Sequence, residues 1–171
     1  MDGTPDPIAA RVLAALDAAG VTYEVVPCDP EFADTAAFCE RYGVPLERSA
    51  NTILVASRTE PKRYAACVVL ASTRLDVNRT VRKRLGVRRC SFADAEETRA
   101  LTGMEIGGVT VAGLPAGVPL WVDARVMEQP WVVVGGGSRS LKVKLVPAEL
   151  LKLGAEVVEG LAMEPRSDLQ G

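Results

Sequence analysis

Three consecutive glycines, Gly135, Gly136 and Gly137, are the part of the sequence best suited to hold a polar ligand with the backbone. They follow an apolar, β-branched run at residues 131–134 that is typical of a buried strand. Glycine has no side chain to keep a ligand from the main chain, and successive N–H groups in a turn can form a nest for a negatively charged oxygen. These glycines therefore predict a binding loop, and the alternative is a plain hairpin turn between two strands.

The chain contains no histidine, which excludes Ser-His-Asp and Cys-His nucleophilic catalysis. Its four cysteines are widely spaced and form no C-x-x-C pair, so we expect reduced thiols and no metal site. They are Cys28, Cys39, Cys67 and Cys90. Any catalysis must then depend on positioned water and hydrogen-bond donors, and no cofactor is expected.

A basic segment at residues 79–89 carries six Lys or Arg residues and no acid. Such a run can follow an RNA backbone through phosphate contacts, although it can also be an ordinary solvated helix face. The whole chain has 20 Lys and Arg against 22 Asp and Glu, a net charge of −2. This balance excludes a general nucleic-acid coat protein, so any RNA contact must be local. The basic residues are Arg79, Arg82, Lys83, Arg84, Arg88 and Arg89.

Helices and strands alternate irregularly around these residues. Helices are expected from Pro7 to Gly20, at residues 35–42, from Asp76 to Gly86, from Asp94 to Gly103 and at residues 147–153. Strands are expected at residues 22–26, 51–56, 63–70, 87–92, 118–122, 131–134 and 141–145. In the last of these, Lys142 and Lys144 alternate with apolar residues, which indicates a half-buried strand.

This order predicts an α/β protein in the loose sense: a single compact domain with a mixed sheet and surrounding helices. We expect the domain at residues 1–162 and a disordered tail at 163–171, where the sequence becomes polar. Residues 104–117 carry four glycines and no helical period, so they are expected to form a loop. The N-terminus has neither a signal-peptide pattern nor a membrane span, so a cytoplasmic location without a membrane partner is expected.

Four segments carry a family resemblance through their order and spacing. They are GVPLERSANTILVAS at 43–57, RLDVNRTVRKRLGVRRCSFADAEETRALTGMEIGGVTVAGLPAGVPLWVD at 74–123, WVVVGGGSRSLKVKL at 131–145 and VPAELLKL at 146–153. Together they resemble the YbaK/ProX family, the free-standing relatives of the editing domain inserted in prolyl-tRNA synthetases. The resemblance extends over roughly residues 8–154.

The resemblance implies a curved mixed sheet wrapped by helices and a trans-editing deacylase activity. Members hydrolyse the ester of a mischarged aminoacyl-tRNA, because a synthetase pocket rejects a smaller amino acid by only about 1–3 kcal/mol. The terminal hydroxyl of the RNA can assist the attacking water, so the missing histidine is no obstacle. The implied partners are the aminoacylated 3′ end of a tRNA and a synthetase, and no DNA.

Two positions depart from the family pattern. Asn51 stands where the family has a lysine in its Ala-Lys-Thr-Leu-like strand, and Val111 stands where the proline of its G-x-x-x-P loop is expected. In the family, the lysine is thought to contact the terminal phosphate or ribose. Asn51 keeps the hydrogen bonding but loses the charge and the reach. Loss of the proline removes a residue that would stiffen the loop.

The candidate residues fall into three groups. The catalytic group is Asn51, Gly107 and Gly108. The substrate-binding group is Thr110, Val111, Gly135, Gly136, Gly137, Ser138 and Arg139, and the tRNA-binding group is Arg79, Arg82, Lys83 and Arg84. Trp121 and Trp131 are expected in the core, and Asp123 is expected to cap a short segment.

Three functions compete. The first is a trans-editing deacylase, which the complete domain and the glycine loop favour. The second is a catalytically weakened tRNA-binding or aminoacyl-binding module of the same fold, which Asn51 and Val111 favour. The third is a protein-interaction subunit that does not bind RNA. The amino acid that is edited does not follow from the sequence.

Overall fold

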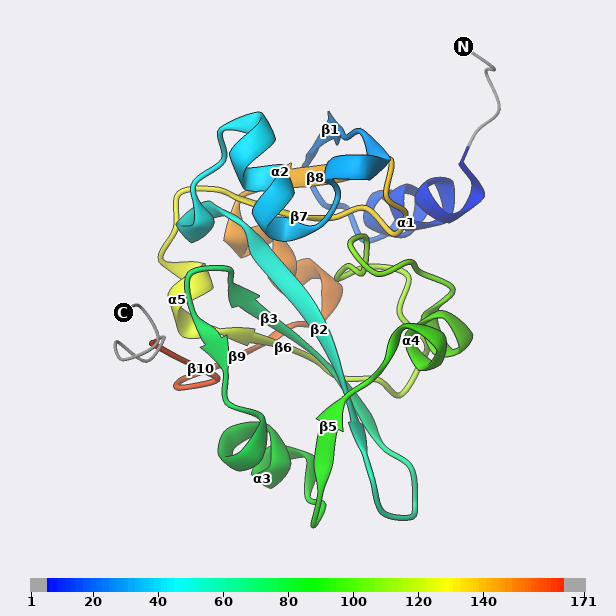
Figure 1. Ribbon diagram of the computed structural model, residues 1–171, viewed down its shortest axis with the longest axis vertical. Helices are drawn as coiled ribbons and strands as arrows, with labels where there is room; N and C mark the ends of the chain where they lie inside the picture. The colour runs from blue at the N-terminus through cyan, green and yellow to red at the C-terminus, as the bar shows by residue number, and fades with distance from the viewer. Residues whose placement is uncertain (1–5, 165–171) are drawn as a thin grey trace.

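The computed structural model describes residues 6–164 of the 171-residue chain. It is a mixed α+β domain with a five-stranded sheet in the order β5-β2-β3-β6-β9, a three-stranded sheet in the order β1-β8-β7 and a two-stranded pair β10-β4 (Figure 1). This confirms the expected fold class. The strands are β1 Glu24–Pro27, β2 Ala50–Ser57, β3 Tyr64–Leu70, β4 Arg74–Leu75, β5 Cys90–Phe92, β6 Leu120–Asp123, β7 Val132–Gly135, β8 Leu141–Leu145, β9 Glu156–Val158 and β10 Ala162–Met163.

The five-stranded sheet combines both strand directions. β2 pairs antiparallel with β3 and β5, whereas β3 pairs parallel with β6 and β6 with β9. The β2–β3 hairpin extends away from the rest of the domain, with β5 beside it (Figure 1). β5 pairs with β2 only from Val55 onward, so the β2 edge before that point lacks a strand neighbour on this side.

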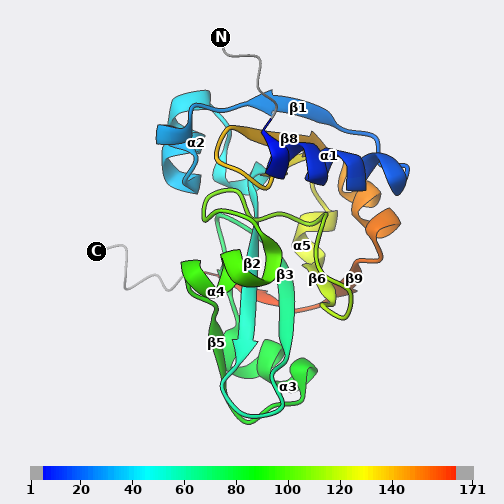
Figure 2. The same cartoon turned by 90° about the vertical axis from the view of Figure 1, so that its right-hand side faces the viewer.

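The three-stranded antiparallel sheet lies across one end of this hairpin, together with α1 (Figure 2). A single parallel bridge between Ser49 and Val133 joins the two sheets. The largest buried cluster fills the space between them, with Val12 and Leu16 of α1, Val68 of β3 and Val134 of β7 among its members. A second cluster packs the opposite face of the five-stranded sheet against the segment after β4.

Most helices begin and end as their caps predict. They are α1 Pro7–Ala18, η1 Pro30–Phe32, α2 Thr35–Tyr42, η2 Leu46–Arg48, η3 Val77–Val81, α3 Arg82–Leu85, α4 Ala95–Thr102, α5 Ala124–Met127 and η4 Pro147–Leu153. The helix expected after Asp76 is a π-helical turn followed by one short α-helix, and residues 147–153 form a 3₁₀-helix.

The C-terminal end of the domain contains one strand, β10, that the sequence did not predict. Met163, where the tail was expected to begin, is the second residue of β10 and pairs with Arg74. Residues 165–171 of the expected tail lie outside the described residues. Within residues 6–164, the longest helix has 12 residues, and none is long and apolar enough to cross a bilayer.

Candidate functional site

A cavity of about 220 Å³ lies where the two sheets meet, beside the open edge of β2. It is bounded by β2, β7, the start of α2 and the loop at residues 106–109. Lys142 is the only charged side chain among its lining residues, which include no Asp or Glu. The lining residues are Thr35, Phe38, Ser49, Ala50, Asn51, Thr52, Ile53, Leu54, Ala93, Thr98, Ile106, Gly107, Val109, Val133, Val134, Gly135 and Lys142.

The open edge of β2 offers main-chain groups to this cavity. The Leu54 carbonyl accepts from the Ala93 amide at 2.9 Å, so Leu54 points its backbone groups away from β3. Residues two apart along a strand share this direction, and Thr52 therefore turns its N–H and C=O toward the cavity edge. The Thr52 hydroxyl is buried without a hydrogen-bond partner among the described residues.

Asn51 lies in the cavity wall with its carboxamide held in one orientation. The hydroxyl of Thr35, the first residue of α2, donates to Asn51 Oδ1 at 2.7 Å. The oxygen is thereby occupied, and no partner of the Asn51 NH₂ group is found among the described residues. Asn51 is therefore placed to donate to a ligand through its nitrogen.

Lys142 is the site residue that sequence reasoning missed. Its alternation with apolar residues on β8 suggested a solvent-facing side chain, yet it is only 7% exposed. Its ammonium donates to the carbonyls of Ala33 at 2.6 Å and Gly107 at 2.5 Å, and Nζ lies 5.4 Å from the centroid of the Phe38 ring. Burial lowers the pKa of Lys142 below its usual value. The sequence feature that could have revealed this placement is the length of the lysine side chain, which can extend past its own strand and beneath a neighbouring loop.

The triple-glycine segment (Gly135, Gly136 and Gly137) is buried and serves close backbone packing. A Cβ on Gly135 would lie 2.7 Å from the Gly108 carbonyl oxygen, and one on Gly136 would lie 2.6 Å from the Leu141 carbonyl oxygen. The Gly137 amide donates to the Gly108 carbonyl at 2.5 Å. The Gly137 amide is therefore not available to the expected nest of ligand-binding N–H groups, because it is bonded within the protein. Gly135 alone of the three lines the cavity.

Of the other expected site residues, Gly107 lines the cavity, whereas Gly108, Thr110 and Val111 do not. Gly108 packs against Ser138, while Thr110 and Val111 are 1% and 3% exposed. Val111, at the family's proline position, belongs to the main core cluster. Sequence periodicity cannot detect this packing, since the loop has no regular period.

Ser138 and Arg139 are used within the protein itself. Ser138 is 3% exposed, and its hydroxyl bonds with that of Ser140 at 2.9 Å. The Arg139 guanidinium donates to the carbonyls of Pro30 and Ile106 and pairs with Asp34 at 2.9 Å. Arg139 thus ties the loop beside the cavity to the segment before α2 and does not line the cavity itself.

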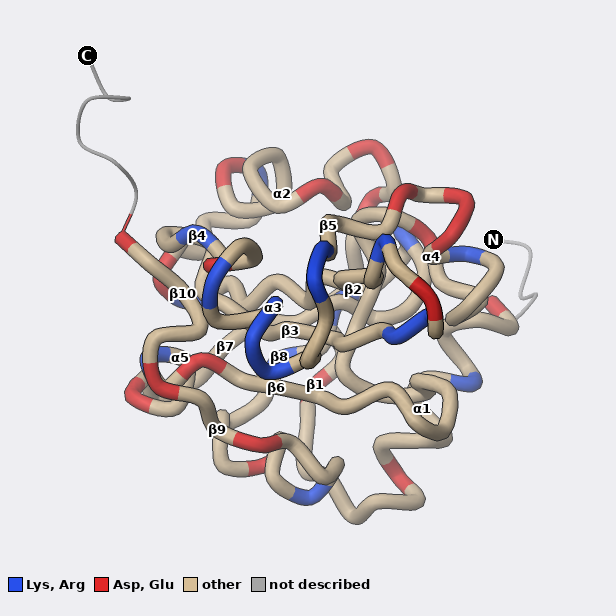
Figure 3. The backbone as a smooth tube through the Cα atoms, turned by 90° about the horizontal axis from the view of Figure 1, so that it is seen from below, with Lys and Arg blue, Asp and Glu red and all other residues tan. Residues whose placement is uncertain are grey.

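The expected tRNA-binding residues lie on η3 and α3, at the end of the molecule toward which the β2–β3 hairpin extends (Figure 1). Figure 3 shows basic residues gathered around α3. Arg79 and Lys83 are exposed, and neither forms an ion pair within residues 6–164. Arg84 instead pairs with Glu156 at 3.2 Å and covers the ring of Trp121 at 5.0 Å. Arg82 donates to the Asn78 carbonyl at 2.9 Å.

The remaining single-residue expectations concern packing. Trp121 is 5% exposed in the second core cluster, as expected. Trp131 is half-buried, with Arg48 and Lys144 at 5.0 and 4.4 Å from its ring centroid. Asp123 caps α5 and accepts from the Ala162 amide at 3.1 Å. The four cysteines are free, and no cluster of metal-ligating side chains occurs in the described part of the chain.

Solved structures with this architecture provide an independent comparison. One, described as a candidate trans-editing enzyme for prolyl-tRNA synthetase, is 26% identical with a TM-score of 0.80, covering 95% of this chain and all of that one. A hypothetical protein is 25% identical with a TM-score of 0.79, over 89% of this chain and 99% of that one. A scaffold protein used for epitope grafting is 24% identical with a TM-score of 0.79, over 94% and 100%, and supports the fold alone.

A protein-family comparison matches residues 29–153 to the aminoacyl-tRNA editing domain. The matched range contains α2, β2, β7, β8 and the loop at 106–109, and hence every wall of the cavity. Because the match covers well over half of the 171 residues, the chain belongs to the aminoacyl-tRNA editing domain family.

Proposed function

We propose that this protein is a trans-editing deacylase that hydrolyses the ester of a mischarged aminoacyl-tRNA in the cavity between its two sheets. The observation that carries the proposal is that this cavity, in an editing-domain fold, is lined by Asn51, Gly107 and Gly135 and contains no carboxylate. An ester is activated relative to an amide, so a held substrate, a water molecule and suitable donors suffice. A volume of about 220 Å³ suits an aminoacyl group and leaves the nucleotides outside.

The terminal adenosine would lie at the mouth of the cavity with its acyl group inside. Asn51 would donate its amide N–H to an oxygen of the acyl or ribose group, since its own oxygen is held by Thr35. The ribose hydroxyl next to the ester would orient the attacking water and relay its proton. This arrangement requires neither histidine nor metal.

The rest of the RNA would approach along one face of the five-stranded sheet. Val55 pairs with Phe92, and side chains two residues apart share a face, so Asn51 and Phe92 project from the same face. The segment η3–α3 packs on that face through Val81 and Leu85, and it carries Arg79 and Lys83. An exposed ring beside the cavity, with cationic residues farther along the same face, is suited to an RNA strand.

A panel of tRNAs, each charged with a correct or an incorrect amino acid, tests the proposal by measuring release of the free amino acid. Hydrolysis of at least one mischarged tRNA, with the correctly charged form of the same tRNA spared, is the expected result. The panel should be run with and without added synthetase, because the relative described as acting for prolyl-tRNA synthetase makes a synthetase the proposed partner.

The alternative is a binding module of the same fold without turnover, and the absence of a lysine at position 51 favours it. Binding of tRNA without release of amino acid would support this alternative. A gain of about tenfold or more in the Asn51→Lys variant, equal to about 1.4 kcal/mol of barrier, would show that the native chain is weakened. If no tRNA binds at low salt, both RNA functions fail.

A further inference from the structure

Lys142 is a buried cation without an acidic partner. It is 7% exposed, and no ion pair of Lys142 is found within residues 6–164. Desolvating an ammonium is costly, and an apolar residue of similar volume would usually be at least as stable. A charge retained under these conditions at a cavity is a candidate functional group.

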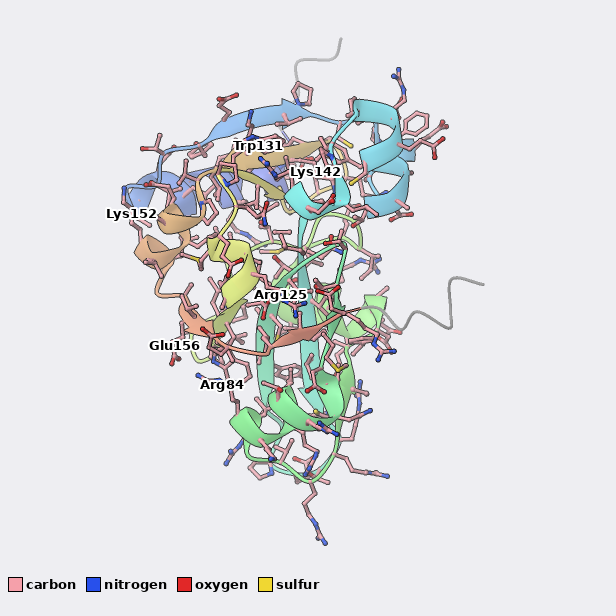
Figure 4. All side chains as sticks on the ribbon, turned by 90° about the vertical axis from the view of Figure 1, so that its left-hand side faces the viewer. Arg84, Arg125, Trp131, Lys142, Lys152 and Glu156 are labelled. Atoms are coloured by element: carbon pink, nitrogen blue, oxygen red, sulfur yellow. The ribbon has the colours of Figure 1, made fainter. Side chains whose placement is uncertain are left out.

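The hydrogen bonds of Lys142 leave one donor for a ligand. An ammonium has three N–H groups, and two of them are bonded to the carbonyls of Ala33 and Gly107. Nζ is thereby fixed between Ala33, which lies just before α2, and the loop at residues 106–109, which bounds the cavity. Figure 4 shows Lys142 beside α2, with its stem leaving β8.

Asn51 is anchored to the same segment as Lys142. Thr35, two residues after Ala33, donates to Asn51 Oδ1 at 2.7 Å, while Lys142 donates to the Ala33 carbonyl at 2.6 Å. Two donors from different sheets, Asn51 on β2 and Lys142 on β8, are thus held by two residues, Ala33 just before α2 and Thr35 at its start. Because no carboxylate lines the cavity, this end of it favours an oxygen that carries negative charge.

We propose that Lys142 is a catalytic residue whose ammonium, together with the Asn51 amide, stabilises the oxyanion that forms on the acyl carbonyl during deacylation. This inference rests on the proposed function. Water attacks the acyl carbon, the new C–O bond forms, and the carbonyl π electrons move to the oxygen held by Lys142 and Asn51. The water proton leaves through the neighbouring ribose hydroxyl to solvent. Collapse of the intermediate breaks the bond to the ribose oxygen, which takes a proton, and Lys142 remains protonated throughout.

Lys142→Gln is the main test, because glutamine can still donate to the two carbonyls but carries no charge. Loss of one oxyanion donor typically lowers turnover by about 100-fold to 1000-fold, so single-turnover hydrolysis of the mischarged tRNA found by the panel should fall to that extent. The dissociation constant for the same tRNA should change little, since the charge acts on the transition state. Lys142→Met provides a second uncharged variant, and circular dichroism checks that both remain folded.

A relocated charge separates this role from a purely structural one. Asn51→Lys should restore part of the hydrolysis rate in the Lys142→Gln background, because both positions line the same cavity. A structural role would not be rescued in this way. An unchanged hydrolysis rate in Lys142→Gln, or a loss that appears only in tRNA affinity, would overturn the proposal.

A second measurement keeps this inference distinguishable from the proposed function. An aminophosphonate ester of adenosine carries a tetrahedral, negatively charged group in place of the acyl carbon and can be titrated by calorimetry. The wild type should bind it about 100-fold more tightly than Lys142→Gln, the factor expected for one oxyanion donor. If no aminoacyl-tRNA is hydrolysed and this difference persists, the proposed function fails while the oxyanion site stands. Equal binding by both proteins overturns the Lys142 assignment.

Discussion

At the scale of single residues, the protonation of Lys142 links the cavity to stability. Burial is the largest influence and lowers its pKa; Arg139 also lowers it, whereas Asp34, Cys28 and Cys39 act in the opposite direction. The unfolded chain has an ordinary lysine pKa of about 10.4 and so binds more protons than the folded chain between the two values. The destabilisation caused by burying the charged ammonium is therefore fully present below the pKa that Lys142 has in the folded protein, and it decreases as pH rises above that pKa.

This predicts how the free energy of unfolding depends on pH. The wild type should gain stability relative to Lys142→Met as pH rises through the lowered folded-state pKa of Lys142 toward about 10.4, measured by urea denaturation. Cys28 and Cys39 interact electrostatically with Lys142, so both proteins should carry Cys28→Ala and Cys39→Ala in this comparison. Parallel stability curves would show that Lys142 has an ordinary pKa.

Gly135 supports the cavity wall by having no side chain. A Cβ at this position would meet the carbonyl oxygens of Gly108 and Val109, which are backbone atoms and cannot rotate away. Gly135→Ala should therefore lower the free energy of unfolding by about 1–3 kcal/mol and reduce deacylation by shifting the loop. Gly117→Ala is the control, because nothing lies within 4 Å of its added Cβ and only its φ of +89° is unfavourable. Equal stability losses in the two variants would contradict the packing role.

The sequence identified three cavity residues, Asn51, Gly107 and Gly135, but missed Lys142. Glycine runs and a family motif are visible as residue types, whereas the destination of a long side chain depends on what packs over its strand. Gly136 and Gly137 show the opposite error, a residue type that indicates a binding site. Their residue type suggested ligand binding, but in the structure they accommodate neighbouring chain segments.

At the scale of elements, α4 depends on a single capping bond. The Asp94 side chain accepts from the Glu97 amide at 2.8 Å, and α4 in turn supplies Thr98 to the cavity lining. Asp94→Ala should lower the free energy of unfolding by about 0.5–2 kcal/mol, measured by chemical denaturation. Glu96→Gln, in the same turn, removes an exposed charge without a capping bond and should cost no more than a few tenths. A similar loss in both variants would assign the effect to charge and not to capping.

Local sequence signals predicted the elements that carry such caps. They failed for elements whose formation depends on contacts between distant segments of the chain. The helix at residues 35–42 was predicted to the residue, since Asp34 and Gly43 bound it. The strands β9 and β10 have only three and two residues, and each exists because a distant strand offers an edge. The π-helical turn η3 also escaped prediction, because its apolar spacing suits an ordinary helix.

At the scale of the whole molecule, the basic segment lies away from the cavity, so it can influence tRNA affinity without affecting chemistry. Arg79 and Lys83 are exposed at that end. Replacing both with Ala should weaken tRNA binding. The slope of the logarithm of the binding constant against the logarithm of the salt concentration should become shallower by about one unit for each lost phosphate contact. Titrations at several salt concentrations measure this. Lys152→Ala is the control, because Lys152 lies elsewhere on η4 and is bonded to Glu149 (Figure 4). An unchanged slope in the double variant would place the RNA on another surface.

The two edge strands of the five-stranded sheet provide a test of the RNA path itself. Phe92 on β5 is 56% exposed and immediately precedes Ala93, which lines the cavity. Val157 on β9, at the opposite edge, is 46% exposed but is not a cavity residue. An exposed ring between a cationic segment and a cavity is suited to stack an unpaired base, a contact that contributes about 1–3 kcal/mol.

Phe92→Ala should therefore weaken binding of a tRNA with an intact single-stranded 3′ end by about 1–3 kcal/mol, measured by fluorescence anisotropy. The same variant should bind a tRNA that lacks these terminal nucleotides as the wild type does, because the base that stacks on the ring is then missing. Val157→Ala should leave both affinities unchanged, although it removes a comparably exposed apolar side chain from the same sheet. Equal weakening of both RNAs by Phe92→Ala would mean that the ring contacts the stem, and the path to the cavity would then have to run along a different strand.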